Sequence, residues 1–172
     1  MEISVLKEAG YEEALLGLSL SYNRPIEEMV SVASRLCGMD DGHNKFLESV
    51  VVWLDINAPR YWWQQFDTYR VGVTKQSEST MHTLTKKEVC AENFEGEVGQ
   101  WTIDKLNKFI KNGNLVAAKR LLPESFLQRR IVCLNYKVIR HIIRQRKTHK
   151  LKEWVGFCEF IPVVVSHPEF LE

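Results

Sequence analysis

The apolar positions of this chain fall into runs whose spacing changes along the sequence. The run Val51–Ile56 is β-branched and aromatic, which predicts a buried strand. Pro59 ends this run, because proline lacks a backbone N–H and restricts the conformation of Ala58 before it. The stretch from Pro59 to about Val71 is rich in aromatic residues and predicts a helix. The segment Thr74–His82 predicts a loop or the first turn of a helix.

The remaining apolar residues recur mainly at helical spacing, three and four positions apart. They predict a short strand at Ile3–Leu6, helices at Tyr11–Leu20, Pro25–Leu36, Ile103–Lys111 and Val116–Leu122, and a long helical pattern from Leu134 through Cys158. Asn23 is the expected cap of the second of these helices, and Thr102 that of the third. The prolines of the final segment, Ile161–Glu172, predict a short strand or an extended tail.

The size and charge of the chain exclude several classes of protein. At 172 residues it is long enough for one domain with its own core. Its 23 basic and 22 acidic residues nearly balance, which argues against duplex nucleic acid as a partner. No apolar run approaches the roughly 20 residues of a membrane-spanning helix. The sequence does not open with a basic and then apolar leader, so we expect a cytoplasmic protein.

The four cysteines lie far apart in the sequence, at Cys37, Cys90, Cys133 and Cys158. Zinc sites in proteins use closely spaced pairs of ligands, and no such pair occurs here. The spacing therefore predicts buried free thiols and no metal site.

Polar residues in and after the central segment are the candidates for ligand contacts. The amide of Gln65 and the guanidinium of Arg70 suit a phosphate or the edge of a base, although a solvated helix face has the same composition. Hydroxyls around Ser79 can bind an anion at a helix start, or belong to an ordinary loop. The basic face from Arg140 to Lys150 either lines an anionic site or is solvated, and His43 faces a cofactor or the solvent. No P-loop, GxGxxG, HExxH or GxSxG motif occurs.

The order of the polar residues provides a more specific signal. In chain order they are Gly42-His43, Glu48, Ala58-Pro59, Gln65, Thr68-Tyr69-Arg70, Ser79, Leu122-Pro123, Asn135, Arg146, His149 and Glu153. This order resembles that of the flavin-dependent thymidylate synthases, whose signature is RHRxxSxNxxSxR, from about residue 43 to residue 154. The resemblance implies an α+β fold with a mixed or antiparallel sheet and long helices. It also implies a homotetramer with sites between subunits.

The chain departs from the family at most of the signature's charged positions. Thr68 and Met81 stand where the family has arginines, and Tyr69 where it has histidine. Lys119 and Lys137 replace two further arginines, and lysine keeps the charge but loses the two-pronged geometry. A charge-assisted hydrogen bond contributes about 1.5–3 kcal/mol, so these changes weaken phosphate or flavin contacts considerably. The pattern therefore predicts a pocket that persists with a changed ligand.

The resemblance assigns roles to the positions that match. It implies that His43, Asn135, Lys137 and His141 contact FAD. It implies that Gln65, Arg70, Ser79, Lys119 and Arg146 contact a nucleotide, dUMP or a related pyrimidine nucleotide. Arg146 would also be catalytic, because its counterpart in the family stabilises negative charge on the uracil ring while the flavin delivers hydride.

Three functions remain open from the sequence. The first is reductive methylation of dUMP by an active FAD-dependent thymidylate synthase with a folate donor. The second is a binding protein on the same scaffold that sequesters a nucleotide or a nucleotide-derived signal, as phage-type sequestering proteins do. The third is a structural protein whose polar residues pack between subunits. Loss of the signature arginines favours the second, so we predict a nucleotide-binding protein with altered or lost synthase activity.

Overall fold

One antiparallel sheet organises the fold, which a computed structural model describes for residues 1–39 and 42–171. Its strands are β1 (Glu2–Ala9), β2 (Val51–Pro59), β3 (Val73–Ser77) and β4 (Leu127–Asn135), and they lie in the order β1-β2-β4-β3. Along β2 every second side chain from Val52 to Ala58 is completely buried, as the apolar run predicts. The sheet and its helices confirm the predicted α+β class.

Residue contacts divide the chain into two compact units, and all four strands contribute residues to both. Unit 1 comprises Met1–Glu2, Ile56–Tyr69 and Gln76–Ile131. Unit 2 comprises Ile3–Asp55, Arg70–Lys75 and Val132–Glu172. Each unit positions its own share of the candidate contact residues. The single domain expected from the sequence stays a prediction.

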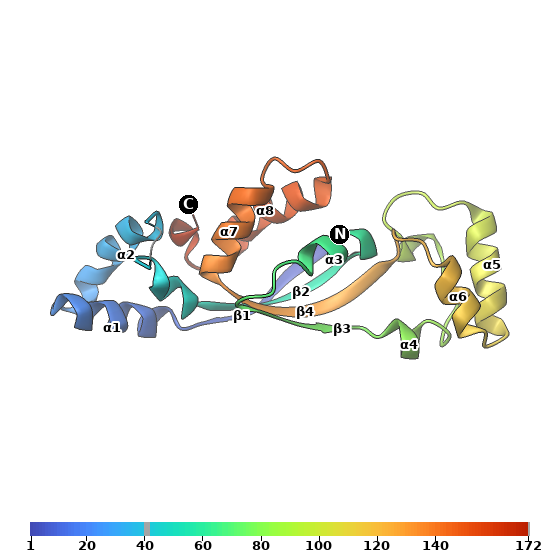
Figure 1. Cartoon of the computed structure of the whole chain (residues 1–172), viewed down its shortest axis with the longest axis horizontal. Helices are drawn as coiled ribbons and strands as arrows, with labels where there is room; N and C mark the ends of the chain where they lie inside the picture. Colours follow the sequence, from blue (N-terminus) through green and yellow to red (C-terminus); the bar gives the residue numbers. More distant parts are fainter. Residues whose placement is uncertain (40–41, 172) are drawn as a thin grey trace. The chain divides into compact units, whose positions relative to one another are not determined.

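Unit 1 carries the helices that follow β2 and precede β4. They are α3 (Arg60–Phe66), α4 (Thr80–Thr83), α5 (Gln100–Lys111) and α6 (Leu115–Leu121), of which α5 and α6 pack against each other (Figure 1). A core of buried apolar side chains, among them Phe94, Leu106 and Leu122, joins α5 and α6 to the preceding segment. Trp63 and Phe66 of α3 are completely buried. Both side chains therefore belong to the hydrophobic core.

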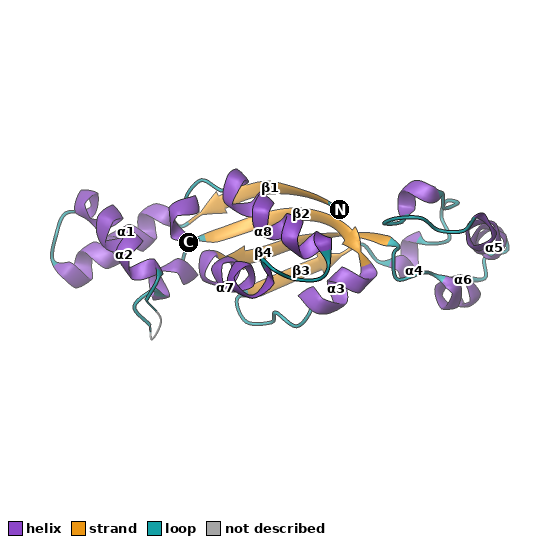
Figure 2. Cartoon of the chain, turned by 90° about the horizontal axis from the view of Figure 1, so that it is seen from above, coloured by secondary structure: helices purple, strands orange, loops and turns teal. Residues whose placement is uncertain are grey.

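Unit 2 contains two helix pairs beside the sheet. The pair α1 (Tyr11–Tyr22) and α2 (Met29–Cys37) follows β1, with the 3-10 helices η1 (Ile26–Glu28) between them and η2 (Lys45–Glu48) before β2. The pair α7 (Tyr136–Arg146) and α8 (Lys152–Val164) follows β4 and lies on one face of the strands of this unit (Figures 1 and 2). A last 3-10 helix, η4 (Pro168–Phe170), packs its Phe170 into the core.

The segment after Pro59 differs from the sequence-based expectation. Helix α3 ends at Phe66 rather than near Val71. Of the segment Thr74–His82, predicted as a loop or a helix start, the first part belongs to strand β3 and a helix, α4, starts at Thr80. The order of strands places β3 at an edge of the sheet, where a strand has one neighbour and can remain largely polar. Because only Val73 of β3 is apolar, the strand left no apolar pattern in the sequence.

The C-terminal third also differs from the expectation. The long helical pattern proves to be strand β4, helix α7 and a separate helix α8, and α8 extends over Ile161–Val164, where a strand or tail was expected. Pro162 lies in the last turn of α8. Because proline has no backbone N–H, one helical hydrogen bond is missing there, but the rest of the helix is unaffected.

Two predicted caps are also wrong. Helix α5 begins after Gly99, so Thr102 lies in its first turn. Asn23 ends α1 in a left-handed conformation, with a φ of 51°, instead of starting the next helix.

Within residues 1–39 and 42–171, no helix is long and apolar enough to cross a membrane.

Candidate functional site

The start of α7 is fixed by a side-chain cap and by a glycine. Asn135 Oδ1 accepts a hydrogen bond of 3.0 Å from the backbone N–H of Val138, which satisfies one of the open donors of the first turn. Gly72 approaches this cap so closely that a Cβ there would lie 2.8 Å from Asn135 Nδ2. The φ of Gly72, 69°, independently favours glycine. Unit 2 therefore holds the Asn135 amide in one place.

The predicted flavin contact Lys137 is already paired with a carboxylate. Its ammonium lies 2.6 Å from Glu48 Oε1, at the end of η2. The two side chains are 38% and 55% exposed, so the pair adds little to stability. The pairing nevertheless cancels the charge of Lys137, and an anionic ligand has to displace Glu48 to use it.

The other predicted flavin contacts, His43 and His141, are exposed on unit 2. His43 lies in the turn before η2, and His141 lies in the middle of α7. Arg70, a predicted nucleotide contact, is also exposed and belongs to the same unit. Unit 2 thus contains all four residues that the resemblance assigns to FAD.

Arg146, the predicted catalytic residue, stacks on an aromatic ring. Its guanidinium carbon lies 4.9 Å from the centre of the Trp154 ring, which α8 presents to the end of α7. Trp154 is completely buried, and the His149 ring lies edge-on to it at 6.4 Å. A cation over the face of a buried indole is attracted by the ring and restricted in orientation. The Arg146 guanidinium is therefore fixed in orientation at the end of α7.

Unit 1 contains the remaining predicted nucleotide contacts, Gln65, Ser79 and Lys119. Gln65 lies in the last turn of α3, and its carbonyl accepts hydrogen bonds from the Thr68 hydroxyl at 2.7 Å and the Thr68 amide at 3.1 Å. Thr68 stands where the family signature has an arginine, and its hydroxyl proton is used within the chain. The position therefore supplies no charge to a ligand.

Lys119 and Ser79 are brought together through a single hydroxyl. The Lys119 ammonium donates to Thr80 Oγ1 at 2.9 Å, and Ser79 directly precedes Thr80 at the start of α4. The partner of this lysine is neutral, in contrast to that of Lys137. The charge of Lys119 therefore remains available to an anion. The Thr80 hydroxyl is one of those around Ser79 that the sequence suggests for anion binding. Its contact with Lys119, however, could not be predicted from the sequence.

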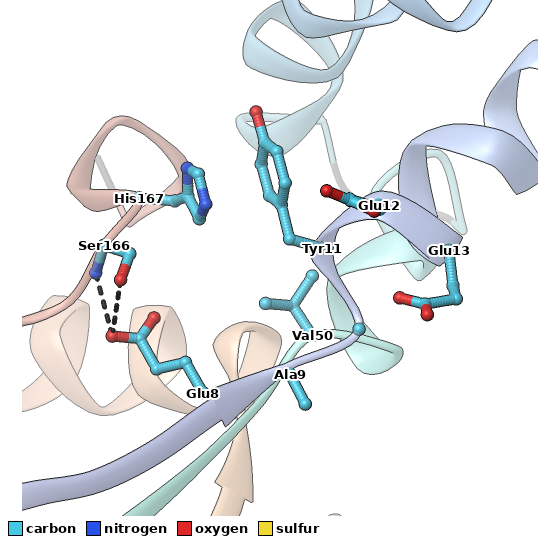
Figure 3. Close-up of a pocket in the computed structure, with 9 residues that line it drawn as sticks. Glu8, Ala9, Tyr11, Glu12, Glu13, Val50, Ser166 and His167 are labelled. Carbon is cyan, nitrogen blue, oxygen red and sulfur yellow. Dashed lines mark hydrogen bonds between the residues drawn. The ribbon is translucent and has the colours of Figure 1, made fainter.

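Sequence reasoning missed a polar cavity in unit 2, with a volume of about 390 Å³ (Figure 3). Its lining includes Glu8, Tyr11, Ser166 and His167. Glu8 Oε1 accepts from the amide and hydroxyl of Ser166, and Glu8 Oε2 accepts from the Tyr136 hydroxyl at 2.6 Å. The rings of Tyr11 and His167 stack with centres 3.4 Å apart. Part of the cavity wall is thus a hydrogen-bonded and stacked network, formed by residues from both ends of the chain.

The cysteines follow the expectation in part. Cys37 and Cys158 are buried free thiols, whereas Cys90 is exposed and Cys133 is half-buried. Burial raises the pKa of the Cys37 thiol to about 11 and that of Cys158 to about 11. Among the residues that the structure describes, no cluster of three His, Cys, Asp or Glu side chains could hold a metal ion.

Comparison with known proteins gives a match in structure. No protein-family model matches the sequence, and no curated protein matches it either. The flavin-dependent thymidylate synthase ThyX from Helicobacter pylori, complexed with FAD and dUMP, has a TM-score of 0.83 at 17% identity, covering 100% of this chain and 98% of that chain. The fold is that of the flavin-dependent thymidylate synthases. A second ThyX structure from the same organism, also with FAD and dUMP, has a TM-score of 0.82 at 16% identity and covers 99% and 97% of the two chains.

The ThyX fold raises the question of whether these residues suit a flavin. Of the four residues predicted to contact FAD, only Lys137 carries a permanent positive charge, and Glu48 holds it at 2.6 Å. The amide of Asn135 and the rings of His43 and His141 suit the uncharged groups of a flavin. The pyrophosphate of FAD fits this set of donors only if Lys137 releases Glu48 and binds phosphate oxygens instead.

Proposed function

We propose that this protein binds a pyrimidine nucleotide of the dUMP class on a ThyX-like fold, with synthase activity altered or lost. The observation that carries the proposal is the contrast between two lysines that replace family arginines. Lys119, on the predicted nucleotide side, contacts a neutral hydroxyl at 2.9 Å, whereas Lys137, on the predicted flavin side, contacts a carboxylate at 2.6 Å. Lys119 thus keeps a positive charge that can bind a nucleotide phosphate, whereas the charge of Lys137 is neutralised by Glu48.

Two further observations support nucleotide binding. Arg146 is oriented by the buried Trp154 ring, and Ser79 lies beside the Thr80 hydroxyl that receives Lys119. The H. pylori ThyX structures that share the fold hold dUMP together with FAD. Sequestration of a nucleotide or a nucleotide-derived signal, of the kind that phage-type proteins perform, requires only the first of these ligands. We also infer a homotetramer, as the fold family implies.

The second candidate is an active FAD-dependent thymidylate synthase that methylates dUMP or a related pyrimidine nucleotide. The oriented guanidinium of Arg146 favours it, because a fixed cation can stabilise negative charge on a pyrimidine ring. In this case FAD, held by His43, Asn135, Lys137 and His141, would supply the hydride when bound. Asn135 and Lys137 would orient it at the start of α7.

Calorimetric titration with dUMP tests the proposal. We expect saturable binding by the purified protein without added flavin. Lys119→Ala and Arg146→Ala should each weaken binding by about tenfold to a hundredfold, because each removes a charge-assisted contact. Lys108→Ala is the matched control, since Lys108 is an exposed lysine of α5 in the same unit as Lys119. Absence of dUMP binding, or equal losses in all three variants, would contradict the proposal.

A further inference from the structure

Strand β4 carries a hydrogen-bonded network within unit 1, apart from the contacts described above. Arg130 lies at its centre, with only 14% of its side chain exposed. Its Nη1 lies 2.9 Å and 3.1 Å from the two carboxylate oxygens of Asp67, and its guanidinium carbon lies 4.4 Å from the centre of the Trp63 ring. Asp67 is the residue that ends α3. Arg130 thus fixes the end of α3 against β4 from two directions.

Gln128, two residues before Arg130 on β4, extends the network to the other side. Gln128 Oε1 accepts from Arg130 Nη2 at 3.1 Å, and the Gln128 carbonyl accepts from Trp63 Nε1 at 2.8 Å. Gln128 Nε2 donates to the carbonyl of Glu78 at 2.7 Å. The Glu78 amide in turn donates to the Arg129 carbonyl at 2.9 Å. Glu78 is therefore held on β4 through both its backbone groups.

The two ends of the network adjoin two predicted nucleotide contacts. Gln65 lies two positions before Asp67, and Ser79 directly follows Glu78. We propose that Gln128 and Arg130 form a clamp on β4 that sets the distance between Gln65 and Ser79, and thereby the affinity for a pyrimidine nucleotide. The inference rests on the proposed function, since it concerns the same contacts. Gln128 and Arg130 are positioning residues, because they act through Gln65 and Ser79.

The composition of the clamp supports a positioning role. The Asp67–Arg130 pair joins α3 to β4, where the buried Trp63 also packs and donates to the Gln128 carbonyl. The Gln128 bond to the Glu78 carbonyl reaches instead to the segment before α4, and the surroundings of this bond are exposed. An exposed hydrogen bond contributes little to folding. Its consequence is to restrict where Ser79 and the start of α4 lie.

The substitution Gln128→Glu tests the clamp by removing one hydrogen bond, from Gln128 Nε2 to the Glu78 carbonyl. The new carboxylate still accepts from Arg130, but it cannot donate to the Glu78 carbonyl and repels that oxygen. Gln76→Glu is the matched control, because it adds the same charge at an exposed position of β3 in unit 1. The probe is dUMP, titrated calorimetrically into each folded variant. We expect the Kd to rise about tenfold in Gln128→Glu, with unchanged stoichiometry, and to stay within about twofold in Gln76→Glu.

Stoichiometry separates positioning from a structural role. A purely structural role would lower the binding-competent fraction and the melting temperature while leaving the Kd of the remaining protein unchanged, which would overturn the clamp. Gln128→Met, which removes both side-chain bonds without adding charge, replaces Gln128→Glu if the latter does not fold, and the same rise in Kd is expected. An unchanged Kd in a folded Gln128 variant also overturns the clamp. Failure of the unaltered protein to bind dUMP refutes the proposed function instead.

Discussion

At the scale of single residues, Gly72 is a position where the backbone tolerates little change. A Cβ there would meet Asn135 Nδ2 at 2.8 Å, and φ is 69°. Gly72→Ala should lower the free energy of unfolding by about 2–3 kcal/mol, from left-handed strain plus the clash. Gly96 has a φ of 74° but open space around it, so Gly96→Ala should cost only about 1 kcal/mol. Urea denaturation measures both, and equal losses would refute the steric account.

The buried thiols make alkaline stability a second prediction at this scale. In the unfolded chain a cysteine ionises near pH 9, whereas burial raises the pKa of Cys37 and of Cys158 to about 11. Their contribution to stability is fully present below pH 9 and is lost as the pH rises through 11, because only the unfolded state releases these protons readily. The melting temperature should therefore fall between pH 9 and pH 11. The fall should be shallower in Cys37→Ala/Cys158→Ala, and parallel curves would contradict this reasoning.

At the scale of elements, the contact between η2 and α7 controls the charge on the predicted flavin side. Glu48→Gln removes the carboxylate that neutralises Lys137. We expect the affinity for FAD to rise about tenfold, while stability changes by less than about 1 kcal/mol because the pair is exposed. Glu27→Gln, an exposed carboxylate of η1 in the same unit, is the control. Fluorescence titration with FAD measures the effect, and equal affinities in both variants would show that Glu48 does not limit flavin binding.

The helices and strands also show how much of the fold the sequence predicts. Strand β2 and helices α1, α5 and α6 were predicted because their apolar residues are periodic and buried on one side. Strand β3 was missed, since an edge strand needs little apolar surface, and β4 was merged into a helix. The clamp of Gln128 and Arg130 was missed with β4, because its partners Asp67 and Glu78 come from distant parts of the chain. Its hydrogen bonds follow from strand pairing rather than from local spacing.

At the scale of the whole molecule, large apolar side chains remain exposed. Leu20, Val71 and Val163 are 77%, 88% and 81% exposed. Scattered apolar residues are common on protein surfaces, but assembly into an oligomer removes such surface from water. We expect light scattering to give a mass of about four chains of 20.1 kDa. A mass of one chain at all concentrations would rule out the tetramer.

The central claim is that the protein holds a pyrimidine nucleotide without flavin. The most direct measurement is an absorption spectrum of the purified protein, followed by mass spectrometry of the ligands that heat releases. Our account predicts a released pyrimidine nucleotide and no blue absorption band of flavin. A stoichiometric flavin band would instead identify the FAD-dependent enzyme, and release of no ligand at all would contradict nucleotide capture.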